Sequence, residues 1–265
     1  MSRTSRSVFQ ASACALAVAT LVLFSVAAQA ASINYGDFGP VGPAPGLMFM
    51  QVTETAITDP PPLYGPPSPY NTGLDFNPAG FVATTQNGGA DITDAQLTFT
   101  VMGNATPQLI GAINSISVLE AGDYTIVGGP GTAATQVLAG VIVRATVTQL
   151  NGVNVAPILL PPVNASFGDS LPGNHIVAPW SLNALVDVQA ALVGLGFGPG
   201  VLATKVDVNI DNTLVAVSEP GTVAFIAKKD FIIDIVPDVF IVPEPGSVAL
   251  VMFALCGLGI VRRRS

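Results

Sequence analysis

Apolar residues recur at every second position in many short segments between residues 47 and 236 of the chain. This period is typical of a half-buried β-strand, because successive side chains of a strand point to opposite faces of the sheet. The segments are rich in β-branched residues and are separated by clusters of Gly, Pro, Asn and Asp. They predict strands at 47–54, 96–103, 115–119, 124–128, 140–150, 153–160, 204–211, 213–218, 222–229 and 230–236. We therefore expect an all-β fold, mainly an antiparallel β-sandwich.

The segments between these strands predict turns, one helix and one extended loop. Residues 120–123 (EAGD) and 150–152 (LNG) have the composition of hairpin turns. Residues 181–194 (SLNALVDVQAALVG) have apolar positions at helical spacing, with Ser181 as the expected N-cap and Gly194 after the end. Six prolines within residues 58–73 predict an extended loop that lies on the domain, since aromatic residues alternate with them.

The first thirty residues have the organisation of a secretory signal peptide. Two arginines precede an apolar stretch, which ends in Ala28-Gln29-Ala30 before Ala31. A basic segment, an apolar segment and a small-x-small cleavage site occur in this order in signal peptides. We predict that residues 1–30 are recognised by the Sec translocon and removed by signal peptidase, so that the mature chain begins at Ala31. The alternative is an uncleaved anchor helix.

The chain ends with three features in a fixed order. Two prolines in residues 242–246 (VPEPG) predict an extended linker, because proline can neither continue a strand ladder nor donate a backbone hydrogen bond. The uncharged residues 247–261 would form a helix of about 22 Å, which is short for a bilayer core of about 30 Å. The basic tail at 262–265, three arginines and a serine, is expected to stay in the cytoplasm. We predict a transmembrane helix at 247–261, with a buried terminal helix as the alternative.

This terminal arrangement resembles the PEP-CTERM sorting signal of Gram-negative bacteria. The residues that carry the resemblance are Pro243, Glu244, Pro245, Arg262, Arg263 and Arg264, with the apolar run between them. The resemblance implies a protein that is recognised at the inner membrane by an exosortase, cut near the Pro-Glu-Pro motif and passed to the cell surface or the exopolysaccharide matrix. Stretches such as TDPPPLYGPP and EAGDYTIVG are also similar to a group of PEP-CTERM proteins. That similarity covers most of residues 35–236 and carries no catalytic motif. It supports one domain, which we place at residues 31–241.

The charge of residues 31–241 excludes some classes of partner. Four basic residues and sixteen acidic residues leave this segment with a net charge of −12. Such a surface repels phosphate backbones, so we expect no nucleic-acid binding. Cys14 and Cys256 both lie in the terminal apolar runs, and His175 is the one histidine, so a Cys/His metal site is excluded. A metal would need oxygen ligands, and no other cofactor is predicted.

One segment has the residue types of a calcium ligand set. Asp207, Asn209 and Asp211 space three oxygen side chains as a calcium-binding loop would. The residues between them are apolar, a pattern typical of a half-buried strand. We therefore favour the outer face of a strand and keep calcium as the alternative.

Three aromatic residues are candidates for stacking on a sugar ring. They are Trp180, in a Pro-rich segment before the expected helix, and Tyr64 and Tyr70, in the proline loop. A buried position at one end of the sandwich is the alternative for Trp180.

The chain shows no motif of an enzyme. The G-x-S-x-G pattern of a nucleophile elbow does not occur, and the separation of carboxylate pairs such as Asp91 and Asp94 cannot be read from sequence. We expect no enzyme activity and predict an exported cell-surface or exopolysaccharide-matrix protein with a structural or adhesive role. The alternatives are a carbohydrate-binding module and, third, a secreted hydrolase.

Overall fold

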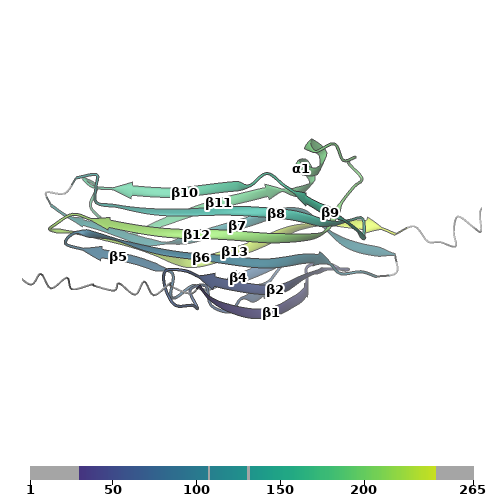
Figure 1. The fold of residues 1–265 in the computed structure, drawn as a ribbon, viewed down its shortest axis with the longest axis horizontal. Helices are drawn as coiled ribbons and strands as arrows, with labels where there is room; N and C mark the ends of the chain where they lie inside the picture. The colour runs from purple at the N-terminus through teal and green to yellow at the C-terminus, as the bar shows by residue number, and fades with distance from the viewer. Residues whose placement is uncertain (1–29, 107, 130–131, 243–265) are drawn as a thin grey trace, which may run out of the picture.

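The structure is a computed structural model that describes residues 30–106, 108–129 and 132–242. Within these ranges the chain forms β-strands and one short helix (Figure 1). The elements are β1 (Ala31–Val41), β2 (Leu47–Ala56), β3 (Ser68–Tyr70), β4 (Gly73–Phe76), β5 (Val82–Gln86), β6 (Gly89–Gly103), β7 (Leu109–Gly128), β8 (Gln136–Leu150), β9 (Val153–Leu159), β10 (Val163–Ser170), β11 (His175–Asp187), α1 (Val188–Gly194), β12 (Ala203–Ser218) and β13 (Thr222–Ile241).

The predictions for the chain ends fall almost entirely outside these ranges. Residues 1–29 and 243–265 lie outside the described residues. They contain nearly all of the predicted signal peptide, most of the linker, the transmembrane helix and the basic tail. Ala31, the predicted first residue of the mature chain, is the first residue of β1. No helix in the described part of the chain has the length and apolar content that a membrane crossing requires.

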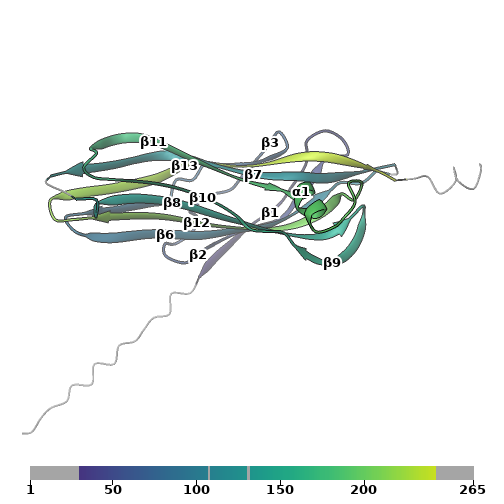
Figure 2. The ribbon, with the colours of Figure 1, turned by 90° about the horizontal axis from the view of Figure 1, so that it is seen from above.

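Every strand pairing in the sheet is antiparallel, and the pairings form two runs. One run follows the order β1-β2-β6-β12-β8-β10, with β9 also paired to β8. The other contains β11-β7-β13, with β4 and β5 paired to β13 and β3 paired to β4. The two runs are joined where Ala203 of β12 pairs with Ile113 of β7, which makes the sheet continuous. Figure 2 shows the runs as two elongated layers, one above the other, and in Figure 1 one layer lies behind the other.

The predicted class, a mainly antiparallel all-β fold with one short helix, is confirmed. The sheet is one continuous, nearly closed surface that is folded over on itself. Burial alternates along β12, where Val206, Val208 and Ile210 point inward at every second position. One face of each strand is therefore apolar and packs against the opposite part of the sheet. The predicted strands 204–211 and 213–218 form this single strand, and 222–229 and 230–236 likewise form β13, with a bulge between Lys228 and Asp230.

One of the two predicted hairpin turns is confirmed and the other is wrong. At 150–152 the chain does turn, with Asn151 and Gly152 at φ of 49° and 79°. Residues 120–123 instead lie inside β7, which runs straight through from Leu109 to Gly128. Gly122 permits this close pairing, since a Cβ atom at its position would lie 1.9 Å from the carbonyl oxygen of Ala227 on β13. Glu120, the first polar residue of this segment, is buried within the strand and does not belong to a turn.

The helix is shorter than its apolar spacing predicts. The first half of the expected helix is strand, because residues 181–187 belong to β11 and alternate between buried and exposed positions. The buried members of this half are Leu182, Ala184 and Val186. The predicted N-cap at Ser181 is therefore wrong. Asp187 caps the helix, and its Oδ1 accepts a hydrogen bond of 2.8 Å from the backbone N–H of Ala190.

The proline loop lies on the domain as predicted. Its Leu63 and Tyr64 are buried, and the backbone N–H of Leu63 donates a 2.5 Å hydrogen bond to the buried carboxylate of Glu54. The ring of Tyr64 packs against Phe81 and Phe231 with centroid distances of 5.1 and 5.0 Å. The loop thus contributes an aromatic residue to the core between the layers.

Candidate functional site

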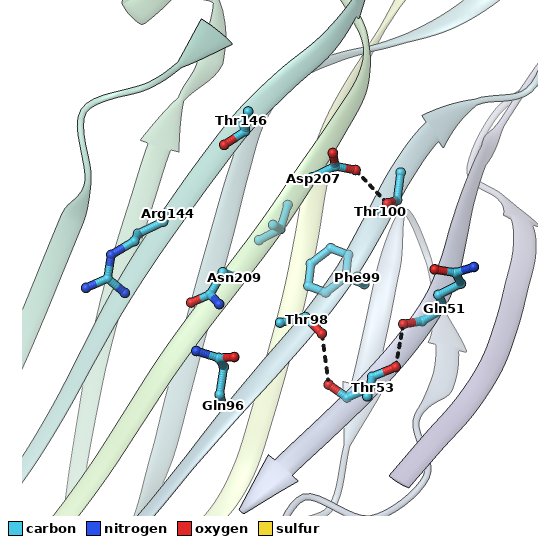
Figure 3. Close-up of a pocket in the computed structure, with 11 residues that line it drawn as sticks. Gln51, Thr53, Gln96, Thr98, Phe99, Thr100, Arg144, Thr146, Asp207 and Asn209 are labelled. Atoms are coloured by element: carbon cyan, nitrogen blue, oxygen red, sulfur yellow. Dashed lines mark hydrogen bonds between the residues drawn. The ribbon is translucent and has the colours of Figure 1, made fainter. Parts of the chain in front are cut away.

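An open polar groove crosses the outer face of the first layer. It has a volume of about 530 Å³ and lies over the neighbouring strands β2, β6, β12 and β8 (Figure 3). Its lining residues are Gln51, Thr53, Gln96, Thr98, Phe99, Thr100, Arg144, Thr146, Asp207, Val208 and Asn209. Most of these side chains are hydroxyls and amides, so the groove presents many neutral hydrogen-bonding groups.

Strand register sets these polar side chains in rows across the sheet. Asn209 of β12 is paired with Thr98 of β6 on one side and with Arg144 of β8 on the other. Two residues earlier on β12, the neighbours of Asp207 are Thr100 and Thr146. Adjacent strands lie about 4.8 Å apart, so each row offers polar groups at regular intervals.

Hydrogen bonds hold part of this array in place. Thr100 Oγ1 donates to Asp207 Oδ1 at 2.6 Å, and Gln96 Nε2 donates to Asp211 Oδ1 at 2.7 Å. Arg144 forms an ion pair with the other oxygen of Asp211. In the described ranges the buried Oδ1 of Asn209 has no hydrogen-bond partner.

The calcium candidate is placed on this outer face. Asp207, Asn209 and Asp211 alternate with buried apolar residues, which confirms the strand interpretation. Side chains two residues apart on a strand are separated by roughly 6.6 Å, whereas calcium holds its oxygen ligands at about 2.3–2.6 Å. The three groups therefore do not converge on one point. The part of the chain that the structure describes contains no cluster of three or more His, Cys, Asp or Glu residues suited to a metal ion.

Two of the three candidate stacking rings are buried. Trp180 is 3% exposed, its Nε1 donates a 3.1 Å hydrogen bond to the carbonyl of Ala227, and its ring stacks on Phe167. Tyr64 is 0% exposed. A sugar-stacking ring must present one face to solvent, so the stacking prediction is wrong for both. Tyr70 is 45% exposed on β3, and its stacking role stays a prediction.

His175 takes part in a polar cluster at the surface. Its Nε2 lies 3.2 Å from Asp169 Oδ2, which also accepts a 2.6 Å hydrogen bond from the hydroxyl of Tyr124. Burial, with a smaller effect of Asp169, raises the pKa of Tyr124 to about 12. The hydrogen bond from Tyr124 lowers the pKa of Asp169. The cluster joins β7, β10 and β11 and keeps Asp169 ionised at neutral pH.

Sequence reasoning missed a group of polar residues between the two layers. Lys228 of β13 and Glu120 of β7 are each 1% exposed, and Lys228 Nζ lies 2.8 Å from Glu120 Oε2. The same Nζ donates a 2.5 Å hydrogen bond to Oδ1 of Asn212, which comes from β12 in the opposite layer. We call these three residues the core triad.

Aromatic rings surround the amine of the core triad. Nζ of Lys228 lies 4.4 Å from the ring centroid of Phe81, 5.0 Å from that of Phe231 and 5.4 Å from that of Tyr64. In the described residues, Asn212 Nδ2, the Tyr64 hydroxyl and Glu120 Oε1 are buried and have no hydrogen-bond partner. The core triad is therefore enclosed by apolar surface and only partly satisfied by hydrogen bonds.

The surroundings of the core triad favour the uncharged forms of both ionisable groups. Burial raises the pKa of the Glu120 carboxyl, an effect that the charge of Lys228 opposes. Burial also lowers the pKa of the Lys228 amine, against the opposing effect of Glu120. Desolvation disfavours a charge on either group because the apolar interior solvates ions poorly.

Comparisons with known proteins assign no family to the chain. No family model matches it, and no curated protein matches it. Among solved structures, it is similar to the enzymatically active domain of tailspike protein 4 of bacteriophage CBA120, with 15% identity and a TM-score of 0.20 over 76% of this chain and 19% of that one. A structure of the infectious bursal disease virus Gt strain has 16% identity and a TM-score of 0.08, over 80% and 57% of the two chains.

These similarities are too low to carry an argument about fold or function. The chain spans about a fifth of the tailspike chain that it matches. The strand pairings and the groove by themselves define the class of the domain, an antiparallel all-β domain with a polar groove on one outer face.

Proposed function

We propose that the chain is an exported cell-surface or exopolysaccharide-matrix protein with a structural or adhesive role. The observation that carries the proposal is the set of polar rows on the outer face of β6, β12 and β8. Hydroxyl and amide side chains at regular spacing suit contacts with a hydroxyl-rich polymer along an open surface. Strands of 15 and 16 residues give this face a long, rigid support.

The proposal includes a β-sandwich domain and a sorting route. Two facing layers with apolar residues between them support the sandwich description. The sorting route consists of export through the Sec translocon, signal peptidase cleavage before Ala31, a tether through residues 247–261 and exosortase cleavage near Glu244. Its support is the order of residue types at the two chain ends.

The acidic character of the domain affects which polysaccharides it can bind without divalent cations. With a net charge of −12 over residues 31–241, the domain repels an anionic polysaccharide. We therefore expect binding to an anionic polymer to require divalent cations that bridge the two, and binding to a neutral polymer to be independent of them.

Removal of two amides from the groove is expected to weaken adhesion. Each lost hydrogen bond costs about 0.5–1.5 kcal/mol, so Gln96→Ala combined with Asn209→Ala should reduce affinity by about 5-fold to 150-fold. The measurement is binding of the purified protein to the exopolysaccharide of the producing bacterium, with calcium and with a chelator. The matched control is Asn183→Ala, which removes an exposed amide from β11 in the other layer. Unchanged binding by the groove variant would contradict the adhesive role of this face.

A carbohydrate-binding module that stacks sugars on Tyr70 is the second candidate function. The observation that favours it is the exposed ring of Tyr70 on β3. In the same assay, a loss of binding in Tyr70→Ala with full binding by the groove variant would favour the stacking module over the polar face.

A further inference from the structure

We propose that Lys228 and Asn212 join in an intramolecular isopeptide bond, formed with the help of Glu120, which fastens β13 to β12 across the core. The inference goes beyond the adhesive role and does not depend on it, because it rests on the geometry of the core triad alone.

The two reacting groups are already in contact. Nζ of Lys228 lies 2.5 Å from Oδ1 of Asn212, which places the amide carbon bonded to that oxygen beside the amine. Reacting groups that a protein holds at near-attack distance gain an effective molarity of about 10⁵–10⁸ M over free reactants. The strands that carry them belong to opposite layers of one packed core, which keeps this geometry fixed.

The surroundings provide the protonation states that the reaction needs. An amine attacks a carbonyl carbon only in its neutral form, and burial lowers the pKa of the Lys228 amine. A carboxyl group can donate a proton only when it is protonated, and burial raises the pKa of Glu120. The rings of Phe81, Phe231 and Tyr64 exclude the water that would otherwise solvate the charged forms.

The reaction balances without any other reactant. The lone pair of Lys228 Nζ forms a bond to Cγ of Asn212, and Glu120 protonates the amide oxygen as it gains negative charge. Glu120 then accepts a proton from Nζ and transfers it to Nδ2. The bond between Cγ and Nδ2 breaks, ammonia leaves, and the proton on the amide oxygen returns to Glu120. Glu120 ends in its starting state, and the product is a neutral amide between the two side chains.

The product also resolves an unfavourable feature of the core. A buried ion pair is stable only when further hydrogen bonds satisfy its polar atoms, and Glu120 Oε1 has none in the described part of the chain. After the reaction no charge is needed at Lys228. Its remaining N–H can donate to Glu120 Oε2, the oxygen that lies 2.8 Å from Nζ.

Tryptic peptide mapping of the full chain, purified from cells, tests the inference. Trypsin does not cleave after an acylated lysine, so the linked protein yields residues 206–229 as one peptide that is lighter by one ammonia molecule. Tandem spectra of this peptide should lack backbone fragments from within the ring between Asn212 and Lys228. Recovery of residues 206–228 at their unmodified mass would overturn the proposal.

Three variants distinguish ammonia loss through the isopeptide bond from ammonia loss by other reactions. Glu120→Gln should yield residues 206–228 and Lys228→Met residues 206–229, each at the full mass of its own sequence. Asn209→Ala, on the same strand and in the same peptide, is the matched control and should retain the ammonia loss. Ammonia loss that persists in Lys228→Met would show cyclisation of Asn212 by itself, and would also overturn the proposal. The wild-type peptide decides the question even where a variant does not fold.

Discussion

Replacement of the whole core triad by apolar residues is expected to lower the midpoint of thermal unfolding by roughly 6–12 °C. The change is Lys228→Met with Glu120→Leu and Asn212→Leu, which keeps the side-chain volumes similar. A covalent link between positions 16 residues apart restricts the unfolded chain. By analogy with a disulfide that closes a loop of this length, the restriction is worth about 3 kcal/mol, and each kcal/mol shifts the midpoint by about 2–4 °C in a domain of this size.

The same variant distinguishes the covalent link from a simple ion pair. When a buried ion pair is replaced by apolar residues of similar volume, stability often stays the same or rises. An apolar variant that unfolds at or above the wild-type temperature would therefore contradict the covalent link. Arg144→Met is the control, because it removes an exposed ion pair with Asp211 that contributes about 0–1 kcal/mol. Calorimetry or circular dichroism of the purified proteins gives the midpoints.

Trp180→Ala is expected to destabilise the domain by about 3–5 kcal/mol. The ring is 3% exposed, so its removal leaves a cavity next to Phe167. The carbonyl of Ala227 also loses its hydrogen bond from Nε1, and Ala227 directly precedes Lys228 at the bulge of β13. The free energy of unfolding in urea measures the effect.

The exposed ring of Tyr70 provides the control for this substitution. Tyr70→Ala should change the free energy of unfolding by no more than about 0.5 kcal/mol, as is usual for surface positions. If Trp180→Ala were as stable as the wild type and failed to bind polysaccharide, Trp180 would be a surface stacking ring, and its placement in the core would be wrong.

The positions of the strands follow from the sequence because their side chains alternate strictly. On β12 the inward positions are Val206, Val208, Ile210 and Asn212. On β7 they include Ile116, Val118 and Glu120. This period identifies the inward position of each member of the core triad, but it does not show that the three residues meet. The turn prediction at residues 120–123 is wrong because turn residues and buried polar residues have a similar composition.

The helix prediction failed because two periods fit the same residues. Leu182, Leu185 and Val186 match helical spacing, whereas Leu182, Ala184 and Val186 match a strand. Ala184 is a weak hydrophobic signal, and pairing of β11 with β7 decides in favour of the strand. Tertiary pairing of this kind is not visible in local sequence.

The groove could not be predicted, because its strands are distant in sequence. The alternation along β12 does predict that Asp207, Asn209 and Asp211 share one outer face, and the structure confirms it. The hydrogen bond between Gln96 and Asp211 nevertheless joins residues 115 positions apart, and the ion pair of Arg144 with Asp211 joins residues 67 apart. Alternation assigns each residue to a face of its own strand, but it does not determine which strands are neighbours.

Peptide mass spectrometry of the protein recovered from the extracellular matrix and from the membranes of the producing bacterium tests its proposed export and sorting most directly. We expect the matrix protein to begin at Ala31, to end close to Glu244 and to lack residues 248–265. A variant in which Pro243, Glu244 and Pro245 are replaced by alanine should remain uncut in the inner membrane. Protein found only in the cytoplasm, or matrix protein that still carries residues 1–30 or 248–265, would contradict the proposed route.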